Sequence, residues 1–171
     1  MPYTISQHLG YTVWANAKLS QILENVDESV LKKETPSSFP TIEKTILHIW
    51  DAELIWLKRL QGESLRDWPS KNFSGGRDTL ISAWVEHSVT FKEYIDGKGE
   101  AFLRETINYT NTSGHPYSNS VEEIIYHVVN HGTFHRGQII TMLRANGVTK
   151  LADSEALSST DLITYLRTAA T

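Results

Sequence analysis

Three of the seven histidines in the chain follow one another at intervals of four residues, at His127, His131 and His135. In an α-helix this spacing places the three imidazole rings on one face. One ion cannot bind all three rings, because eight residues rise about 12 Å along a helix while a Zn–N bond is about 2 Å long. Two neighbouring histidines can share an ion, and a third ligand must then come from elsewhere. His48, inside another strongly apolar segment, is the natural candidate.

Three protein imidazoles around a divalent cation are typical of a catalytic site, because a further coordination position stays open to water or to another small molecule. Such a cation lowers the pKa of bound water, or of a bound thiol, toward neutrality. The pattern is not a metalloprotease zinc helix, which has a glutamate where this chain has Gly132. It is not a ferritin-like di-iron motif either, because no Glu-x-x-His occurs in the sequence.

Two charged residues next to these histidines have open roles. Arg136 either grips a carboxylate or phosphate of a small-molecule substrate or pairs with an acidic residue on a neighbouring helix. Asp51, one turn after His48, either orients that imidazole through its second nitrogen or is a surface carboxylate. No general base is identified by spacing.

His127 is expected to be a core histidine one turn below the site, because pairing it with His131 would leave His135 unused. The remaining histidines are expected to face solvent or to form local hydrogen bonds, and four tryptophans are expected in the core. These residues are His8, His87 and His115, and Trp14, Trp50, Trp56 and Trp84.

Apolar residues at helical spacing predict the long helices that must position these side chains. Their expected ranges are Tyr3–Val26, Thr41–Gln61, Asp78–Gly97 and Ser120–Asn146. The last helix begins with the capping box Ser120-x-x-Glu123 and stops before a glycine. Residues 101–118 are rich in β-branched and aromatic side chains, and they predict a short hairpin or extended excursion between the third and fourth helices. Asp161–Arg167 is expected to form one last short helix.

These patterns predict an all-α fold, an antiparallel four-helix bundle in a single domain that spans residues 1–171. Metal sites in bundles form between facing helices, so His48 on the second helix suits a site with His131 and His135 on the fourth. Gly10, inside the first helix, predicts a close packing contact or a bend.

The composition excludes several classes of partner. A net charge of −4 without a basic run argues against nucleic-acid binding. The chain has no cysteine, so any metal site is built from histidine and carboxylate, and the expected location is the reducing cytoplasm. No segment approaches membrane-spanning length and the N-terminal residues do not form a signal peptide, so no membrane partner is expected.

The run Asn130–Gln138, NHGTFHRGQ, resembles the signature of the DinB/YfiT-like superfamily, the damage-inducible DinB family. Tyr11–Asn16, Thr45–Leu60 and the tyrosine-rich segment NYTNTSG are similar to their family counterparts, so the resemblance covers nearly the whole chain. It implies an antiparallel four-helix bundle, a homodimer and a histidine triad that binds a divalent metal cation, zinc or nickel. Carried over to this sequence, the triad falls on His48, His131 and His135. Many members have a histidine where this chain has Phe134, a position outside the triad.

Some members of the superfamily resemble transferases or isomerases that use bacillithiol or mycothiol. The resemblance therefore implies a metal-dependent enzyme with a small-molecule substrate and a low-molecular-weight thiol as candidate cosubstrate. The alternatives are a metal-dependent hydrolase and a non-catalytic, metal-stabilised binding or stress-response protein. The last alternative predicts a fourth protein ligand and a closed site, whereas an open coordination position favours an enzyme.

Overall fold

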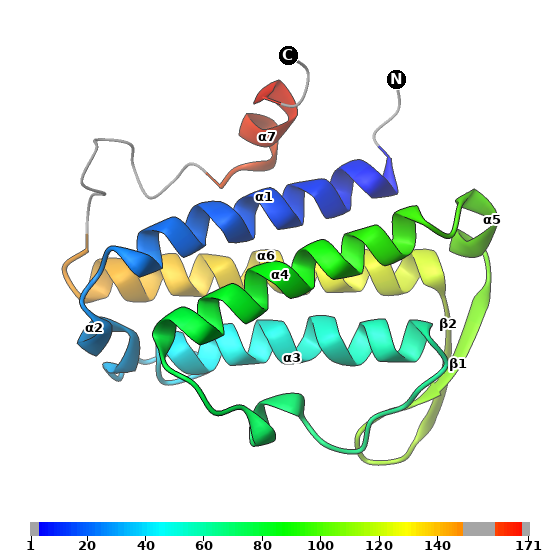
Figure 1. Cartoon of the computed structure of the whole chain (residues 1–171), viewed down its shortest axis with the longest axis horizontal. Coiled ribbons are helices and arrows are strands. Elements are labelled where there is room, and N and C mark those ends of the chain that lie inside the picture. Colours follow the sequence, from blue (N-terminus) through cyan, green and yellow to red (C-terminus); the bar gives the residue numbers. More distant parts are fainter. Residues whose placement is uncertain (1–3, 149–159, 169–171) are drawn as a thin grey trace.

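The structure is a computed structural model that describes residues 4–148 and 160–168. Within these residues, the long helices are α1 (Ile5–Glu24), α3 (Ile42–Leu60), α4 (Arg77–Asp96) and α6 (Val121–Ala145) (Figure 1). The short elements are α2 (Glu28–Lys32), the 3₁₀ helix η1 (Pro69–Asn72), α5 (Glu100–Leu103), β1 (Thr106–Thr110), β2 (Pro116–Ser120) and α7 (Leu162–Thr168). The predicted helical bundle is confirmed, and its hairpin lies between the third and fourth long helices. The prediction of one domain over residues 1–171 includes 1–3, 149–159 and 169–171, which lie outside the described residues.

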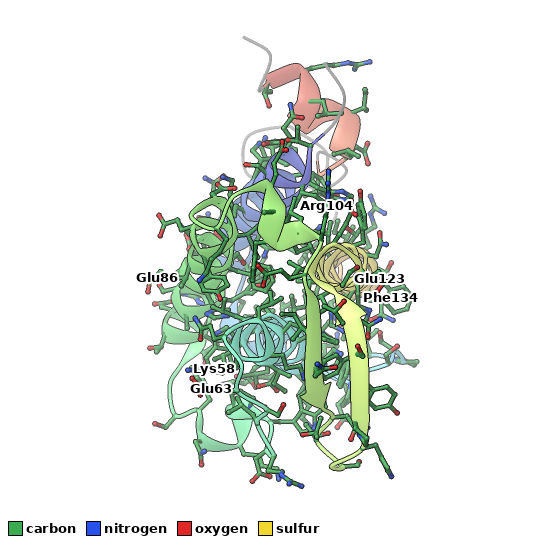
Figure 2. The ribbon with its side chains drawn as sticks, turned by 90° about the vertical axis from the view of Figure 1, so that its right-hand side faces the viewer. Lys58, Glu63, Glu86, Arg104, Glu123 and Phe134 are labelled. Atoms are coloured by element: carbon green, nitrogen blue, oxygen red, sulfur yellow. The ribbon has the colours of Figure 1, made fainter. Side chains whose placement is uncertain are left out.

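Each long helix packs against two others, and α3 lies diagonally across the bundle from α1. In the end-on view of Figure 2, α6 lies beside α3, and the β1–β2 hairpin extends downward from α6 along the side of α3. The two strands are antiparallel, with Tyr109 opposite Tyr117. No helix in the described part of the chain is long and apolar enough to cross a membrane.

The helix directions refine the predicted antiparallel arrangement. The pairs α1–α4 and α3–α6 are antiparallel, whereas α3 and α4 run in the same direction (Figure 1). The cause is the connection of residues 61–76, which returns along the length of the bundle instead of forming a tight turn. At about 3.3 Å per residue, such a segment easily spans the roughly 28 Å of α3.

Local sequence signals fix where the helices begin and end. Ser120 Oγ accepts a hydrogen bond from the Glu123 amide at 3.2 Å, and the Glu123 carboxylate accepts one from the Ser120 amide at 2.9 Å. This is the predicted capping box, and it starts α6. Thr41 caps α3 in a similar way, through the Lys44 amide at 3.1 Å. Gly147, with φ of 85°, follows the end of α6, because only glycine adopts this backbone conformation without strain.

Apolar residues fill the bundle in two clusters along its length. One cluster surrounds Trp84, which is fully buried, and the other surrounds Phe91 near the hairpin. The other predicted core tryptophans, Trp14, Trp50 and Trp56, are only partly buried. A Cβ atom added to Gly10 would lie 2.3 Å from the hydroxyl oxygen of Tyr165 on α7, so the predicted close contact is confirmed.

A layer of buried polar side chains, one from each long helix, separates the two apolar clusters. Asn16 donates hydrogen bonds to Glu53 at 3.3 Å and to Ser88 at 2.7 Å. Ser88 donates to the second Glu53 oxygen at 2.8 Å, and Arg136 donates to the Asn16 carbonyl at 2.9 Å. This polar layer, Asn16–Glu53–Ser88–Arg136, ties the four helices together in one register, because a slipped helix would leave its polar group buried without a partner.

Glu53 makes the stability of the fold depend on pH. Burial raises the pKa of its carboxyl group from 4.5 to about 7, despite the nearby charge of Arg136. The folded state therefore holds the proton more tightly than the unfolded chain. We expect the contribution of Glu53 to the free energy of unfolding of the metal-free protein to fall by on the order of 3 kcal/mol as the pH rises from about 4.5 through about 7.

Glu53→Gln should remove this contribution, so the stability of the variant should increase relative to the wild type as the pH rises, because a glutamine amide reproduces the donor and acceptor of the protonated carboxyl group without titrating. Urea denaturation at several pH values in the presence of a chelator measures the effect. Glu86→Gln is the matched control, because Glu86 lies on the outer side of α4, away from the polar layer (Figure 2). An equal change in the pH dependence of both variants would contradict the assignment to Glu53.

Candidate metal centre

The packing of α3 against α6 brings three imidazole rings together. His48 comes from α3, and His131 and His135 come from successive turns of α6. The ring centroids are 4.5 to 4.7 Å apart, and the ring nitrogens that could act as ligands all lie within 4.8 Å of one another. The Nε2 atoms of His48 and His131 are 2.8 Å apart. The three histidines that the sequence singled out therefore form one cluster, which we call the triad.

The surroundings of the triad favour neutral imidazoles. Burial, together with the neighbouring imidazoles, lowers the pKa of His131 to about 3 and that of His48 to about 4. Burial also lowers the pKa of His135. At neutral pH the rings therefore carry no charge, and their nitrogen lone pairs are available to a cation.

A hydrogen bond to Gln138 sets the orientation of His135. The His135 Nδ1 atom lies 2.7 Å from the amide oxygen of Gln138, and the Gln138 nitrogen donates to Ser38 at 2.8 Å. Because an amide oxygen only accepts, Nδ1 carries the proton and Nε2 keeps its lone pair for the triad. Sequence reasoning gave Gln138 no role. Its place three residues after His135, on the same side of the helix, was the available signal.

A cavity of about 420 Å³ opens beside His48. Phe39 and Trp68 form aromatic walls, with ring centroids 4.2 and 5.9 Å from that of His48. Leu47 adds apolar surface, and the exposed Lys44 and Lys71 also line the cavity. The cavity reaches the triad at His48, and its apolar and cationic side chains suit a small anionic or polarised molecule.

Asp51 has neither of its two expected roles. Its side chain is only 4% exposed, and its two oxygens accept hydrogen bonds from the Ser70 amide at 2.7 Å and the Ser70 hydroxyl at 2.5 Å. Asp51 therefore anchors η1, the segment that follows Trp68, over the cavity. Helical periodicity placed Asp51 on α3, but it carried no information about the loop that covers that face.

Arg136 points away from the triad into the polar layer. It is 2% exposed, and it donates hydrogen bonds to Asn16 and to Thr133, both at 2.9 Å. Its guanidinium carbon lies 5.3 Å from the ring centroid of Tyr11. These contacts match the intramolecular alternative rather than a substrate contact. The hydrogen-bond partners of Arg136 are neutral, and the acidic residue Glu53 acts on Arg136 through its charge without a hydrogen bond.

His127 borders the triad without joining it. Its ring centroid is 5.8 Å from that of His131 and 5.3 Å from that of Trp56. Among the described residues, the cluster able to hold an ion contains only the triad. The expectation that His87 faces solvent or bonds locally is wrong, because it is partly buried against the backbone of Glu53 on another helix.

A helical bundle with a histidine cluster between two facing helices defines a class of candidate metal proteins. The DinB family model matches residues 1–160, and the chain belongs to the DinB family. Protein DinB of Bacillus subtilis (strain 168) is 27% identical over 144 residues, which cover 80% of this chain and 83% of that protein. A crystal structure of a DinB-like protein from Bacillus cereus ATCC 10987 matches with a TM-score of 0.66 and 16% identity, over 88% of this chain and 95% of that one. This last likeness shows the shared fold.

The depressed pKa values predict that acid destabilises the metal-free protein. Protonation of His48 and His131 favours the unfolded chain, whose histidines titrate near 6.5. The contribution of these two histidines to the free energy of unfolding should therefore be greatest above pH 6.5 and fall as the pH drops toward 4, opposite in sign to the contribution of Glu53. Urea denaturation in chelator measures this slope, and His131→Asn should reduce it because asparagine does not titrate. An unchanged slope in that variant would contradict the prediction.

Proposed function

We propose that this DinB-family protein is a metal-dependent enzyme in which His48, His131 and His135 bind a divalent cation, zinc or nickel. The observation that carries the proposal is the convergence of three neutral imidazoles from two facing helices beside an open cavity. A cation held by neutral ligands keeps its full charge, and it supplies Lewis-acid chemistry that makes a thiolate or a hydroxide available near neutral pH. The proposed reaction is attack by a low-molecular-weight thiol, or by water, on a small electrophilic substrate.

The geometry of the triad fits such a cation. Two nitrogens bound to one zinc at about 2.1 Å lie at most about 4.2 Å apart. Because the triad nitrogens lie within 4.8 Å of one another, a movement of less than about 1 Å per ring reaches coordination distance. The set contains only nitrogen donors from histidine, which suit zinc and nickel better than magnesium or calcium.

The protein's own residues orient and enclose the reactants. Gln138 holds the His135 ring with Nε2 directed to the triad. Phe39 and Trp68 cover His48 and offer apolar surface to the body of a substrate. Lys44 places a positive charge at the cavity. A transferase substrate with an aromatic or aliphatic body and a negative or electron-rich group fits these walls.

A closed, purely structural metal site is the main alternative. It requires a fourth protein ligand, and the cluster found in residues 4–148 and 160–168 has three. The cavity beside His48 also gives a small molecule access to the triad. Both observations support an enzyme over a metal-stabilised binding protein. Homodimeric assembly and a cytoplasmic location stay predictions.

Metal analysis of purified variants tests the site. Wild-type protein should bind about one divalent ion per chain, and His48→Ala, His131→Ala or His135→Ala should each reduce the bound metal to near zero, because two imidazoles do not hold the ion against a chelator. His127→Ala is the matched control on the same helix and should keep the metal. Circular dichroism confirms that each variant is folded. Loss of metal from the folded His127→Ala protein would overturn the assignment.

A substrate screen then separates the two reactions. Metal-loaded protein is incubated with a small thiol and an electrophile such as chlorodinitrobenzene, and separately with activated esters and amides without the thiol. Metal-dependent thiol consumption that is lost in His131→Ala supports the transferase. Hydrolysis without thiol supports the hydrolase, and turnover of neither class with a fully loaded site would favour the binding protein.

A further inference from the structure

Arg59, near the end of α3, is a buried cation without an acidic partner. It is 7% exposed, and its Nε atom is buried without a hydrogen-bond partner. Within the described residues, no carboxylate forms an ion pair with it. Arginine side chains this deeply buried are normally paired, because an unpaired buried charge is costly. The exception therefore needs a physical explanation.

Two aromatic rings account for the position of the guanidinium but not for its hydrogen-bonding capacity. The guanidinium carbon lies 4.3 Å from the ring centroid of Trp56 and 4.7 Å from that of Tyr109. Tyr109 is itself held by a hydrogen bond from its hydroxyl to Asn119 at 2.9 Å. Cation–π contacts stabilise the charge. Among the described residues, none accepts a hydrogen bond from the guanidinium, whose Nε is buried, so this group is held in place with its donors unused.

The position of Arg59 relates it to the triad. Arg59 follows His48 by three helical turns on the same face of α3, about 16 Å along the axis. His127 lies between them, since its ring is in contact range of both Trp56 and His131. No hydrogen bond to the His127 ring is found in the described part of the chain. The triad, His127 and Arg59 thus form a continuous line of polar groups between α3 and α6, which we call the polar line.

We propose that Arg59, together with His127, binds a carboxylate of the small molecule whose reactive atom reaches the triad. A carboxylate matches the planar fork of a guanidinium, and the single N–H of the neutral His127 ring supplies a further donor toward the triad. The inference rests on the proposed function, because it assigns a substrate class to the same site. That class is an elongated small molecule with a thiol at one end and a carboxylate at the other.

Simple long-chain probes test the anion site without metal. The metal-free protein is titrated with undecanoate, undecanol and undecyl phosphate below their micelle concentrations, and tryptophan fluorescence is followed because Trp56 lines the site. Wild-type protein should bind undecanoate about tenfold or more tightly than undecanol, the preference expected for a charge-assisted hydrogen bond. Tighter binding of undecyl phosphate than of undecanoate would overturn the assignment of a carboxylate.

Metal-loaded protein tests the span between the two ends of the polar line. The nickel form is titrated with mercaptoundecanoate, mercaptopropionate and mercaptoundecanol, and the absorbance of the nickel–thiolate contact is recorded. Mercaptoundecanoate should bind most tightly, because mercaptopropionate is too short to reach Arg59 and mercaptoundecanol lacks the charge. Equal affinities for the long acid and the long alcohol would overturn the proposal.

Variants assign the preference to Arg59. Arg59→Met keeps a long side chain against Trp56 but removes the charge, and it should abolish the preference for undecanoate. Lys58→Met is the matched control, because it removes the same charge from the neighbouring residue. Lys58 pairs with Glu63 at 3.2 Å on the side of α3 away from α6 (Figure 2), so this variant should keep the preference. Equal losses in the two variants would show a nonspecific charge effect and overturn the proposal.

Two further results keep the test decisive. If Arg59→Met does not fold, Arg59→Lys replaces it. Lysine keeps the charge but lacks the planar fork of the guanidinium, so this variant should weaken the preference for undecanoate several-fold. An unchanged preference would overturn the proposal. Failure of the triad to bind metal would end the proposed function. In that case, the metal-free preference for undecanoate and its dependence on Arg59 would still decide the anion site separately.

Discussion

The register between α3 and α6 is the constraint on which the site depends. His48 meets His131 and His135 only when the two helices pack at one particular height, and a slip of one turn would separate the rings by about 5.4 Å. Apolar side chains alone tolerate such slips poorly but do not forbid them. The polar layer of Asn16, Glu53, Ser88 and Arg136 prevents such a slip, because each of its side chains forms a hydrogen bond with a side chain on another helix. Arg136 directly follows His135, so the same turn of α6 contributes both to the register and to the triad.

The triad itself opposes folding in the absence of a cation. Three imidazoles are taken out of water and placed so close that protonation of one disfavours protonation of the next, which is why the pKa values of His48 and His131 fall to about 4 and about 3. The short contact between their Nε2 atoms satisfies only one pair of ring nitrogens. A site that repels protons and holds lone pairs inward is suited to a divalent cation, which is the physical basis for reading the cluster as a metal centre rather than a core hydrogen-bond network.

The parts that sequence could predict follow from local rules. Spacing of four residues put His131 and His135 on one face, an apolar helical segment and then the resemblance pointed to His48, and Ser120 with Glu123 marked the start of α6. Contacts between segments far apart in the chain carried no such signal. Asp51 bonds to Ser70 in a loop, Arg136 to Asn16 on the first helix, and the parallel course of α3 and α4 depends on how residues 61–76 are threaded. Periodicity identifies a buried face, but it does not identify which partner covers that face.

The two long connections of the bundle give the site its asymmetry. The segment 61–76 runs back along the bundle and brings Trp68 and Ser70 to one side of the triad. There, a cavity lined by apolar side chains and lysines opens beside His48. The hairpin between α4 and α6 brings Tyr109 to the other side, where it covers Arg59. A simple up-and-down bundle with tight turns would have neither wall. The helices thus supply the candidate metal ligands, while the irregular segments supply two chemically different surroundings on either side of them. This division fits the proposed reaction between two unlike molecules, because it offers each of them a separate binding surface near the triad.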